Sequence, residues 1–276
     1  MYILDTEQLL NKGGEIQMKC ALCGNESKLM QSHIIPKLVY KRIRSHKNSR
    51  FRSLDDFTKV MQDGEKRPML CHDCEELFSS YEVKFVSDFL DEYLNTNKIK
   101  NNISGVVDNY LLTVAWRILW DDLYRLNSHS SHFTRELFEE FCKELGDYLL
   151  SIGANNNARP PFKFKTYIYK LESLIKNKAI HEMAKSTIFG YSVYQSKDNS
   201  VAVIVYYAGL VFVTYYNYDK KKYIFIGQRP ILFKGLVRRK IITEELKLQF
   251  FEMAQQYQKV MSPELQSSIQ EYYKKH

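Results

Sequence analysis

The chain has 276 residues, of which 45% are hydrophobic and 14% aromatic, so it can bury a packed core and is not a disordered protein. Forty Lys and Arg residues against 32 Asp and Glu leave a net charge of +8, which allows nucleic acid or another anionic surface as a partner but proves neither. Asp5 and Glu7 already occur in the first ten residues, which lack a basic start, so we expect no signal peptide there.

The first hundred residues predict a sequence of short elements. Apolar residues at three-to-four spacing after Cys71 predict a helix that reaches about Leu94. A hairpin turning at Asp63-Gly64 is expected to lead the chain to this helix. The remaining elements are expected to be a helix at 6–10, strands at 15–19 and 29–36, a helix at 38–43 and an exposed loop at 45–52.

The polar stretch 95–105 is the predicted domain boundary, which divides the chain into a module at 1–100 and an α+β domain at 101–276. The second domain is expected to combine helices with an antiparallel sheet. Thr134 is the expected N-cap of one of its helices. Its predicted helices lie at 107–125, 134–150, 171–183, after 243 and after 262, and its strands lie at 162–169, 189–195, 201–207, 210–216 and 223–227.

Residues 199–218 contain no charged side chain and have the length of a membrane-spanning helix. They are rich in Val and Tyr, however, and Ala208-Gly209 interrupts them in the middle. A two-stranded hairpin explains this composition better than a membrane helix. We therefore expect no membrane segment and a cytoplasmic protein.

Two Cys-x-x-Cys pairs, Cys20/Cys23 and Cys71/Cys74, predict one tetrahedral zinc site. A two-residue spacer lets both thiolates of a tight turn point at one ion, and the second pair opens a predicted helix whose dipole favours thiolate. In a reducing cytoplasm the pairs are expected to be metal ligands rather than disulfides. Cys142 lies on an apolar helix face and is expected to be part of the core.

No acidic residue occurs between Ser27 and Leu54, whereas basic residues recur throughout this segment. Such a segment is either a solvated face or a surface that contacts phosphates. The residues predicted to bind nucleic acid are Lys37, Lys41, Arg42, Arg44 and Arg50.

Between the cysteine pairs stands Ser32-His33-Ile34-Ile35-Pro36. With the flanking pairs, this motif resembles the zinc-containing HNH (His-Me finger) endonucleases, in which a cysteine pair, a strand ending in Asp-His-Ile-x-Pro, a second strand and a helix-opening cysteine pair follow one another. The resemblance covers about residues 18–90. It implies a treble-clef ββα module with a structural zinc ion, a catalytic Mg²⁺ or Mn²⁺ ion, and His33 as the general base of phosphodiester hydrolysis.

Three positions depart from the family pattern. Ser32 replaces a metal-binding aspartate, Lys66 an asparagine, and Glu75 a histidine or asparagine. Two explanations follow. Glu75 and Glu82, which share a face of the predicted helix, hold the Mg²⁺ or Mn²⁺ ion opposite His33, or the module binds nucleic acid or a partner protein without cutting.

The sequence thus predicts a metal-dependent endonuclease acting on DNA or, as second choice, on RNA. The resemblance also implies a setting in bacterial antiviral defence or a mobile element. The domain at 101–276 is expected to contact a partner protein, to form a homo-oligomer or to sense a ligand.

Overall fold

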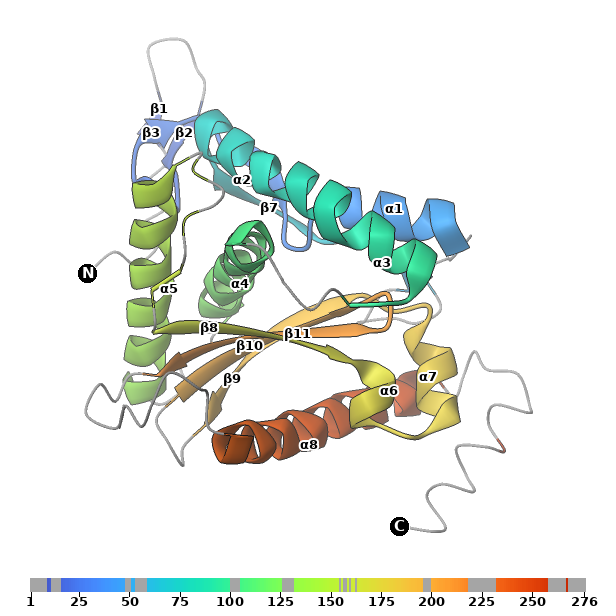
Figure 1. Cartoon of the computed structure of the whole chain (residues 1–276). Helices are drawn as coiled ribbons and strands as arrows, with labels where there is room; N and C mark the ends of the chain where they lie inside the picture. Colours follow the sequence, from blue (N-terminus) through green and yellow to red (C-terminus); the bar gives the residue numbers. More distant parts are fainter. Residues whose placement is uncertain are drawn as a thin grey trace.

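The structure is a computed structural model that describes residues 9–10, 16–47, 51–52, 59–99, 105–125, 132–153, 155, 158, 160–161, 163–195, 200–217, 232–257 and 267. Helices lie on both faces of one large sheet, and the chain is an α+β protein as predicted (Figure 1). The predicted strand at 223–227, the helix after 262 and the side chain of Arg50 lie outside the described residues.

Three small antiparallel sheets form the N-terminal part. β1 (Leu9–Leu10) pairs with β2 (Ile16–Lys19), which pairs with β3 (Glu26–Ser27). β4 (Met30–His33) pairs with β7 (Lys66–Leu70), and β5 (Phe51–Arg52) pairs with β6 (Val60–Met61). The expectation of a helix at 6–10 was therefore wrong for Leu9 and Leu10, which lie in a strand.

The hairpin predicted over residues 57–70 is not formed, because β7 pairs with β4 rather than with the preceding strand. The chain does turn at Asp63-Gly64, but there Gly64 lies directly against the ring of Tyr40 in helix α1 (Lys37–Lys47). A Cβ atom on Gly64 would lie 2.6 Å from the Tyr40 hydroxyl, so no larger residue fits at this position without displacing the ring. Phe51, expected in an exposed loop, packs edge-on against the same ring and is buried.

The helix predicted after Cys71 is confirmed as one continuous rod of α2 (His72–Phe85), the π-helical turn η1 (Val86–Leu90) and α3 (Asp91–Thr96). The predicted apolar spacing faces the core, since Phe78, Tyr81 and Phe85 are fully buried. Asn97 ends the rod in the left-handed conformation at φ 55°, where its N–H donates to the carbonyl of Tyr93.

Helix α4 (Gly105–Arg125) lies between α2, α5 (His132–Ile152) and the large sheet (Figure 1). Most of its residues are buried, as expected for a helix that is apolar almost all round. Tyr110 of α4 stacks on Phe85 of α2 with ring centroids 3.8 Å apart. The prediction of Thr134 as N-cap was wrong, because α5 begins at His132.

The large sheet is antiparallel, with the strand order β8-β11-β10-β9. Its strands are β8 (Phe164–Lys170), β9 (Phe189–Gln195), β10 (Ser200–Tyr207) and β11 (Leu210–Asn217). β10 and β11 form the hairpin predicted in place of a membrane helix, with Ala208 at φ 55° and Gly209 at φ 84° in its two-residue turn. Among the described residues, no helix is both long and apolar enough to cross a membrane.

Three helices cover the sheet face opposite α4: α6 (Leu171–Leu174), α7 (Lys178–Ala184) and α8 (Leu232–Tyr257). The helix expected at 171–183 is thus two helices, because Asn177 adopts an extended conformation and its side chain caps α7 by accepting from the N–H of Ile180. α8 begins eleven positions before Thr243, where the helix was expected.

The predicted boundary at residue 100 does not separate two cores. One hydrophobic cluster runs from the cysteine-bearing segments through α2, α4 and α5 to one face of the sheet. A second cluster fills the other face of the sheet beneath α7 and α8. The N-terminal segment therefore shares its core with α4, and the sheet divides the two clusters.

Arg117 of α4 lies within the first cluster with only 1% of its side chain exposed. Its guanidinium donates to Glu82 at 2.8 Å, lies 3.7 Å from Glu75 and stands 4.9 Å from the centre of the Phe78 ring. All three partners are on α2. This ion pair therefore ties the N-terminal helix to the helix that supports the sheet.

Replacing Arg117 with Ala should destabilise the whole chain by roughly 3–5 kcal/mol, because it leaves a buried carboxylate without its counter-ion. Burial raises the pKa of Glu82 and Arg117 lowers it, so in the variant Glu82 should take up a proton more readily. Urea unfolding measures the loss. Arg135→Ala, which breaks a partly exposed pair with Glu139 one turn away, should cost only about 0.3–0.5 kcal/mol. Equal effects of the two substitutions would contradict a special role for Arg117.

Candidate functional site

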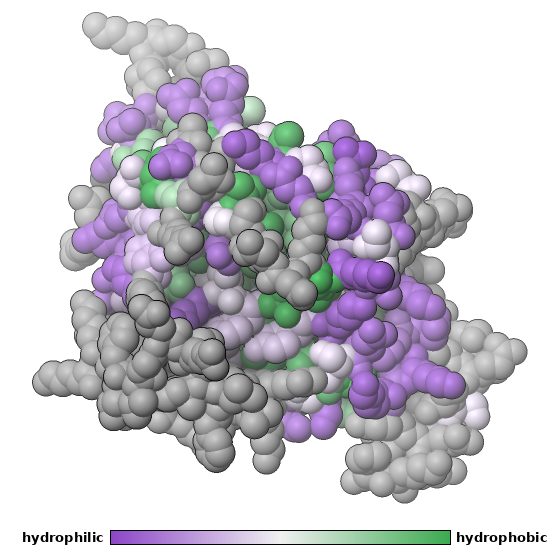
Figure 2. Space-filling model, in the orientation of Figure 1, coloured by the Kyte–Doolittle hydropathy of each residue, from purple (hydrophilic) through white to green (hydrophobic). Residues whose placement is uncertain are grey.

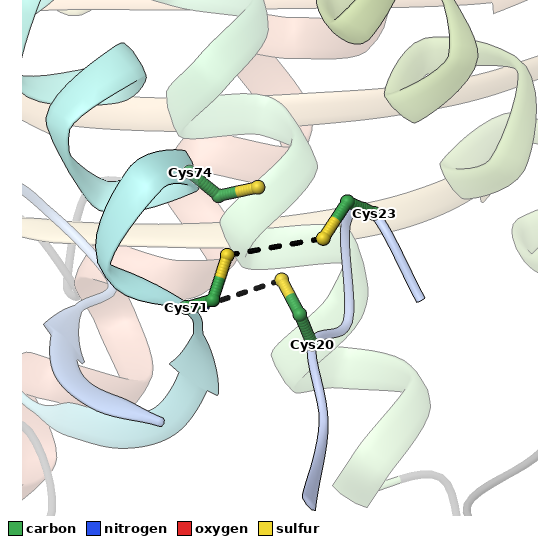
Figure 3. Close-up of side chains that lie close together, drawn as sticks. All are labelled: Cys20, Cys23, Cys71 and Cys74. Atoms are coloured by element: carbon green, nitrogen blue, oxygen red, sulfur yellow. Dashed lines mark hydrogen bonds between the residues drawn. The ribbon is translucent and has the colours of Figure 1, made fainter. Parts of the chain in front are cut away.

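The four cysteines of the two predicted pairs converge on one point (Figure 3). Cys20 and Cys23 lie in the turn between β2 and β3, and Cys71 and Cys74 lie at the N-cap and in the first turn of α2. Gly24 closes the first turn at φ 75°, a conformation that favours glycine, and its N–H donates to the carbonyl of Cys20. The first turn is joined to β7 by the N–H of Ala21, which donates to the carbonyl of Met69.

The spacing of the sulfur atoms fits a tetrahedral metal site. The ligand atoms all lie within 4.8 Å of one another, and the Sγ atoms of Cys23 and Cys71 are 3.8 Å apart. Bonds of about 2.3 Å from a central zinc ion to four thiolates would place neighbouring sulfur atoms about 3.8 Å apart. The cluster can therefore hold one metal ion such as zinc, and it is the one group of three or more potential ligands among the described residues.

The environment of Cys20 favours a thiolate. The thiol of Cys74 is the main donor to its sulfur, the backbone N–H of Cys71 also donates at 3.3 Å, and the pKa of Cys20 lies at about 4. The same shared proton raises the pKa of Cys74. A bound cation would displace this proton, since metals bind cysteine as thiolate. Cys142 lies apart from the cluster in the core of α5, as expected.

His33, the predicted general base, ends strand β4 opposite Lys66 of β7. Its Nε2 atom lies 3.3 Å from Oδ2 of Asp63, in the turn that precedes β7. The ammonium groups of Lys66 and Lys37 lie 3.0 Å and 3.6 Å from the same oxygen. The structure thus joins His33 to a carboxylate and two lysines that come from three different elements; we call these four residues the His33 cluster.

The protonation states within the His33 cluster follow from its contacts. Partial burial lowers the pKa of His33, so its imidazole is neutral at pH 7. The hydrogen bond from Lys66 is the main cause that brings the pKa of Asp63 to about 2, so this carboxylate is ionised and can only accept hydrogen bonds. Nε2 of His33 must therefore carry the proton of the neutral ring while it contacts Asp63.

Ser32 and Glu75, which depart from the family pattern, meet on the other face of β4. Ser32 is fully buried, and its hydroxyl donates to Oε2 of Glu75 at 2.7 Å. Because side chains alternate along a strand, His33 points away from this contact. Glu75 and Glu82 both face Arg117 instead.

The predicted metal-holding group of His33, Glu75 and Glu82 is therefore not assembled within the described part of the chain. The physical reason is that the buried guanidinium of Arg117 supplies the positive charge that the two carboxylates require. A catalytic role for either glutamate stays a prediction.

The residues predicted to bind nucleic acid lie along α1, apart from Arg50, which is outside the described residues. Lys37 and Lys41 are exposed. Arg42 is also exposed and lies 3.4 Å from Asp91 of α3, whereas Arg44 is partly buried. On the face shown in Figure 2, hydrophilic residues dominate the described surface around α2 and α3, and apolar atoms appear only in small areas between them.

Comparison of the chain with models of known protein families, with curated proteins and with solved structures gave no match. The functional interpretation therefore rests on the cysteine cluster and on the contacts of His33. Sequence reasoning missed Asp63 as a partner of His33 and Arg117 as a partner of Glu75. Asp63 was noted only as a turn residue beside Gly64, and no local pattern identifies either contact.

Replacing Cys71 with Ser should remove the bound metal and unfold the N-terminal segment, because metal binding contributes directly to folding free energy. Elemental analysis should find about one zinc ion per wild-type chain, since one Cys₄ shell binds one ion. Cys142→Ser is the matched control, because this cysteine is buried but lies outside the cluster. It should lower the melting temperature without loss of metal. Wild-type protein that carries no metal and is as stable as Cys71→Ser would contradict the metal site.

Proposed function

We propose that the protein is a zinc-stabilised endonuclease of the HNH type that hydrolyses phosphodiester bonds in DNA or, as second choice, RNA. In this proposal β4, β7 and α2 are the ββα element, and the cysteine cluster is its zinc site. The observation that carries the proposal is the His33 cluster. It sets a neutral imidazole beside two ammonium groups at the end of β4, where the resemblance expects the general base.

The chemistry required of these residues is simple. A neutral imidazole can take a proton from an attacking water molecule, and burial lowers the pKa of His33, which favours the neutral form at pH 7. Lys37 and Lys66 place positive charge where the phosphate gains negative charge in the transition state. Both lysines keep substantial exposure, at 51% and 39% of the side chain, so a large polyanion can reach them.

The residues around His33 do not fit the Mg²⁺ or Mn²⁺ ion that the resemblance implies. Among the described residues, Asp63 is the carboxylate in contact with His33, and two lysines already neutralise it. We therefore assign the proposed chemistry to His33 and the lysines. Cleavage assays with EDTA, Mg²⁺ and Mn²⁺ compare this assignment with the metal-dependent one.

A second candidate function is a module that binds nucleic acid or a partner protein without cutting. One observation favours it: Nε2 of His33 is engaged by Asp63, so only Nδ1 of the neutral ring is left to accept a proton from water. Binding without cleavage in every metal condition, including with proteins encoded nearby added, would favour this second function.

His33→Ala should reduce the rate of cleavage by about 10²–10⁴-fold, the usual effect of removing a general base. Metal content and thermal stability should stay close to wild type, because His33 lies on the face of β4 opposite Ser32, away from the cysteines. His72→Ala serves as control, since this histidine is 68% exposed and pairs only weakly with Glu76. Cleavage by His33→Ala at the wild-type rate would refute a catalytic role for His33.

The basic segment should determine how nucleic-acid affinity depends on salt. Replacing Lys41, Arg42, Arg44 and Arg50 with Gln should weaken binding to all sequences alike. The slope of log affinity against log salt should become shallower by up to about 0.9 for each phosphate of B-form DNA that the variant no longer neutralises.

The matched control removes four exposed lysines elsewhere, namely Lys143, Lys176, Lys178 and Lys185. The net charge of the two quadruple variants is equal, so fluorescence anisotropy at several salt concentrations separates a local contact from a general charge effect. If both variants have the same slope, α1 is only a solvated face.

A further inference from the structure

Three nitrogen atoms of the His33 cluster converge on a single oxygen atom. Oδ2 of Asp63 lies 3.0 Å from Nζ of Lys66, 3.3 Å from Nε2 of His33 and 3.6 Å from Nζ of Lys37. These donors come from β7, β4 and the first turn of α1. Proteins bind a phosphate oxygen in the same way, with ammonium groups and N–H donors placed around the negatively charged oxygen.

Stability alone does not explain why these charges are gathered. Both lysines are substantially exposed, and ion pairs in such positions typically contribute only about 0–1 kcal/mol. The backbone that carries Asp63 is held in place, because Gly64 lies tightly against the ring of Tyr40. The carboxylate itself is 24% exposed, so it can leave the three donors by rotation of its own side chain.

The contact with Asp63 also determines what His33 can do. While the ionised carboxylate accepts from Nε2, that nitrogen holds a proton and cannot accept another. The neutral ring then has only Nδ1 free to accept a proton. When Asp63 moves away, the Nε2–H becomes free to donate to another negatively charged oxygen.

We propose that Asp63 is an internal substitute for a phosphate oxygen, which fills an anion site made by His33, Lys37 and Lys66 until a phosphate group displaces it. This inference rests on the proposed function for the identity of the ligand, a phosphodiester or free phosphate. It assigns Asp63 an autoinhibitory role. A carboxylate that instead orients His33 for catalysis would have the opposite effect on binding and on rate.

The test is the binding of inorganic phosphate and of a DNA duplex to the full-length protein, measured by calorimetry and anisotropy. If Asp63 fills the site in at least nine of ten molecules, its removal raises apparent affinity about tenfold or more, because affinity scales with the fraction of the competent form. Asp63→Asn should therefore bind phosphate at least about tenfold more tightly than wild type. Adding Lys66→Ala to this variant should abolish the gain.

Asp88→Asn is the matched control, because it removes the same charge from an exposed position on η1. It should change phosphate affinity by less than about twofold, as expected for a screened surface charge. Thermal unfolding confirms that each variant is folded, and Asp63→Ala repeats the measurement with a different side chain.

Unchanged or weaker phosphate binding by folded Asp63→Asn and Asp63→Ala would overturn the proposal. An equal gain in Asp88→Asn, or no phosphate binding by any variant, would also overturn it. The proposed function fails separately: phosphate binding that rises on removal of Asp63, without cleavage of DNA or RNA by any variant, would retain the anion site and reject the endonuclease.

Discussion

The convergence of four sulfur atoms is the constraint on which the N-terminal half depends. Its strands are two to five residues long, too short to be stable as isolated hairpins. A metal ion held by Cys20, Cys23, Cys71 and Cys74 would join the β2–β3 turn to the junction between β7 and α2, which are distant in sequence. The β4–β7 pair is attached to this junction, so the position of His33 depends on the cysteine cluster although His33 does not touch it.

Arg117 links the N-terminal helix α2 to helix α4 and so to the rest of the chain. Its contacts with Glu75 and Glu82 fix the rotation and height of α2 against α4, and α4 in turn packs on the large sheet. A buried ion pair is seldom a net source of stability, but it tolerates fewer arrangements than an apolar contact does. The C-terminal part therefore supplies the other half of the core of the N-terminal segment.

Local patterns explain which features could be predicted. The helix after Cys71 and the hairpin at 201–216 follow from apolar spacing and turn residues within one segment, and the metal site follows from cysteine spacing. The pairing of β7 with β4 and the contact of Asp63 with His33 join residues about thirty or more positions apart, and no periodicity reports such contacts. The contact of Arg117 with Glu75 was missed because Glu75 and Glu82 were expected to face His33 rather than α4.

The two faces of strand β4 make different contacts. Its side chains alternate, so Ser32 points inward to Glu75 while His33 points outward to Asp63. An aspartate at position 32, as in the family pattern, would place a carboxylate against Glu75 in the interior, where three like charges would share a single arginine. Serine avoids this repulsion because its hydroxyl can donate to Glu75. Ser32 and the buried pair with Arg117 thus belong to one set of interior contacts, whereas His33 and its lysine neighbours lie on the other face of the strand.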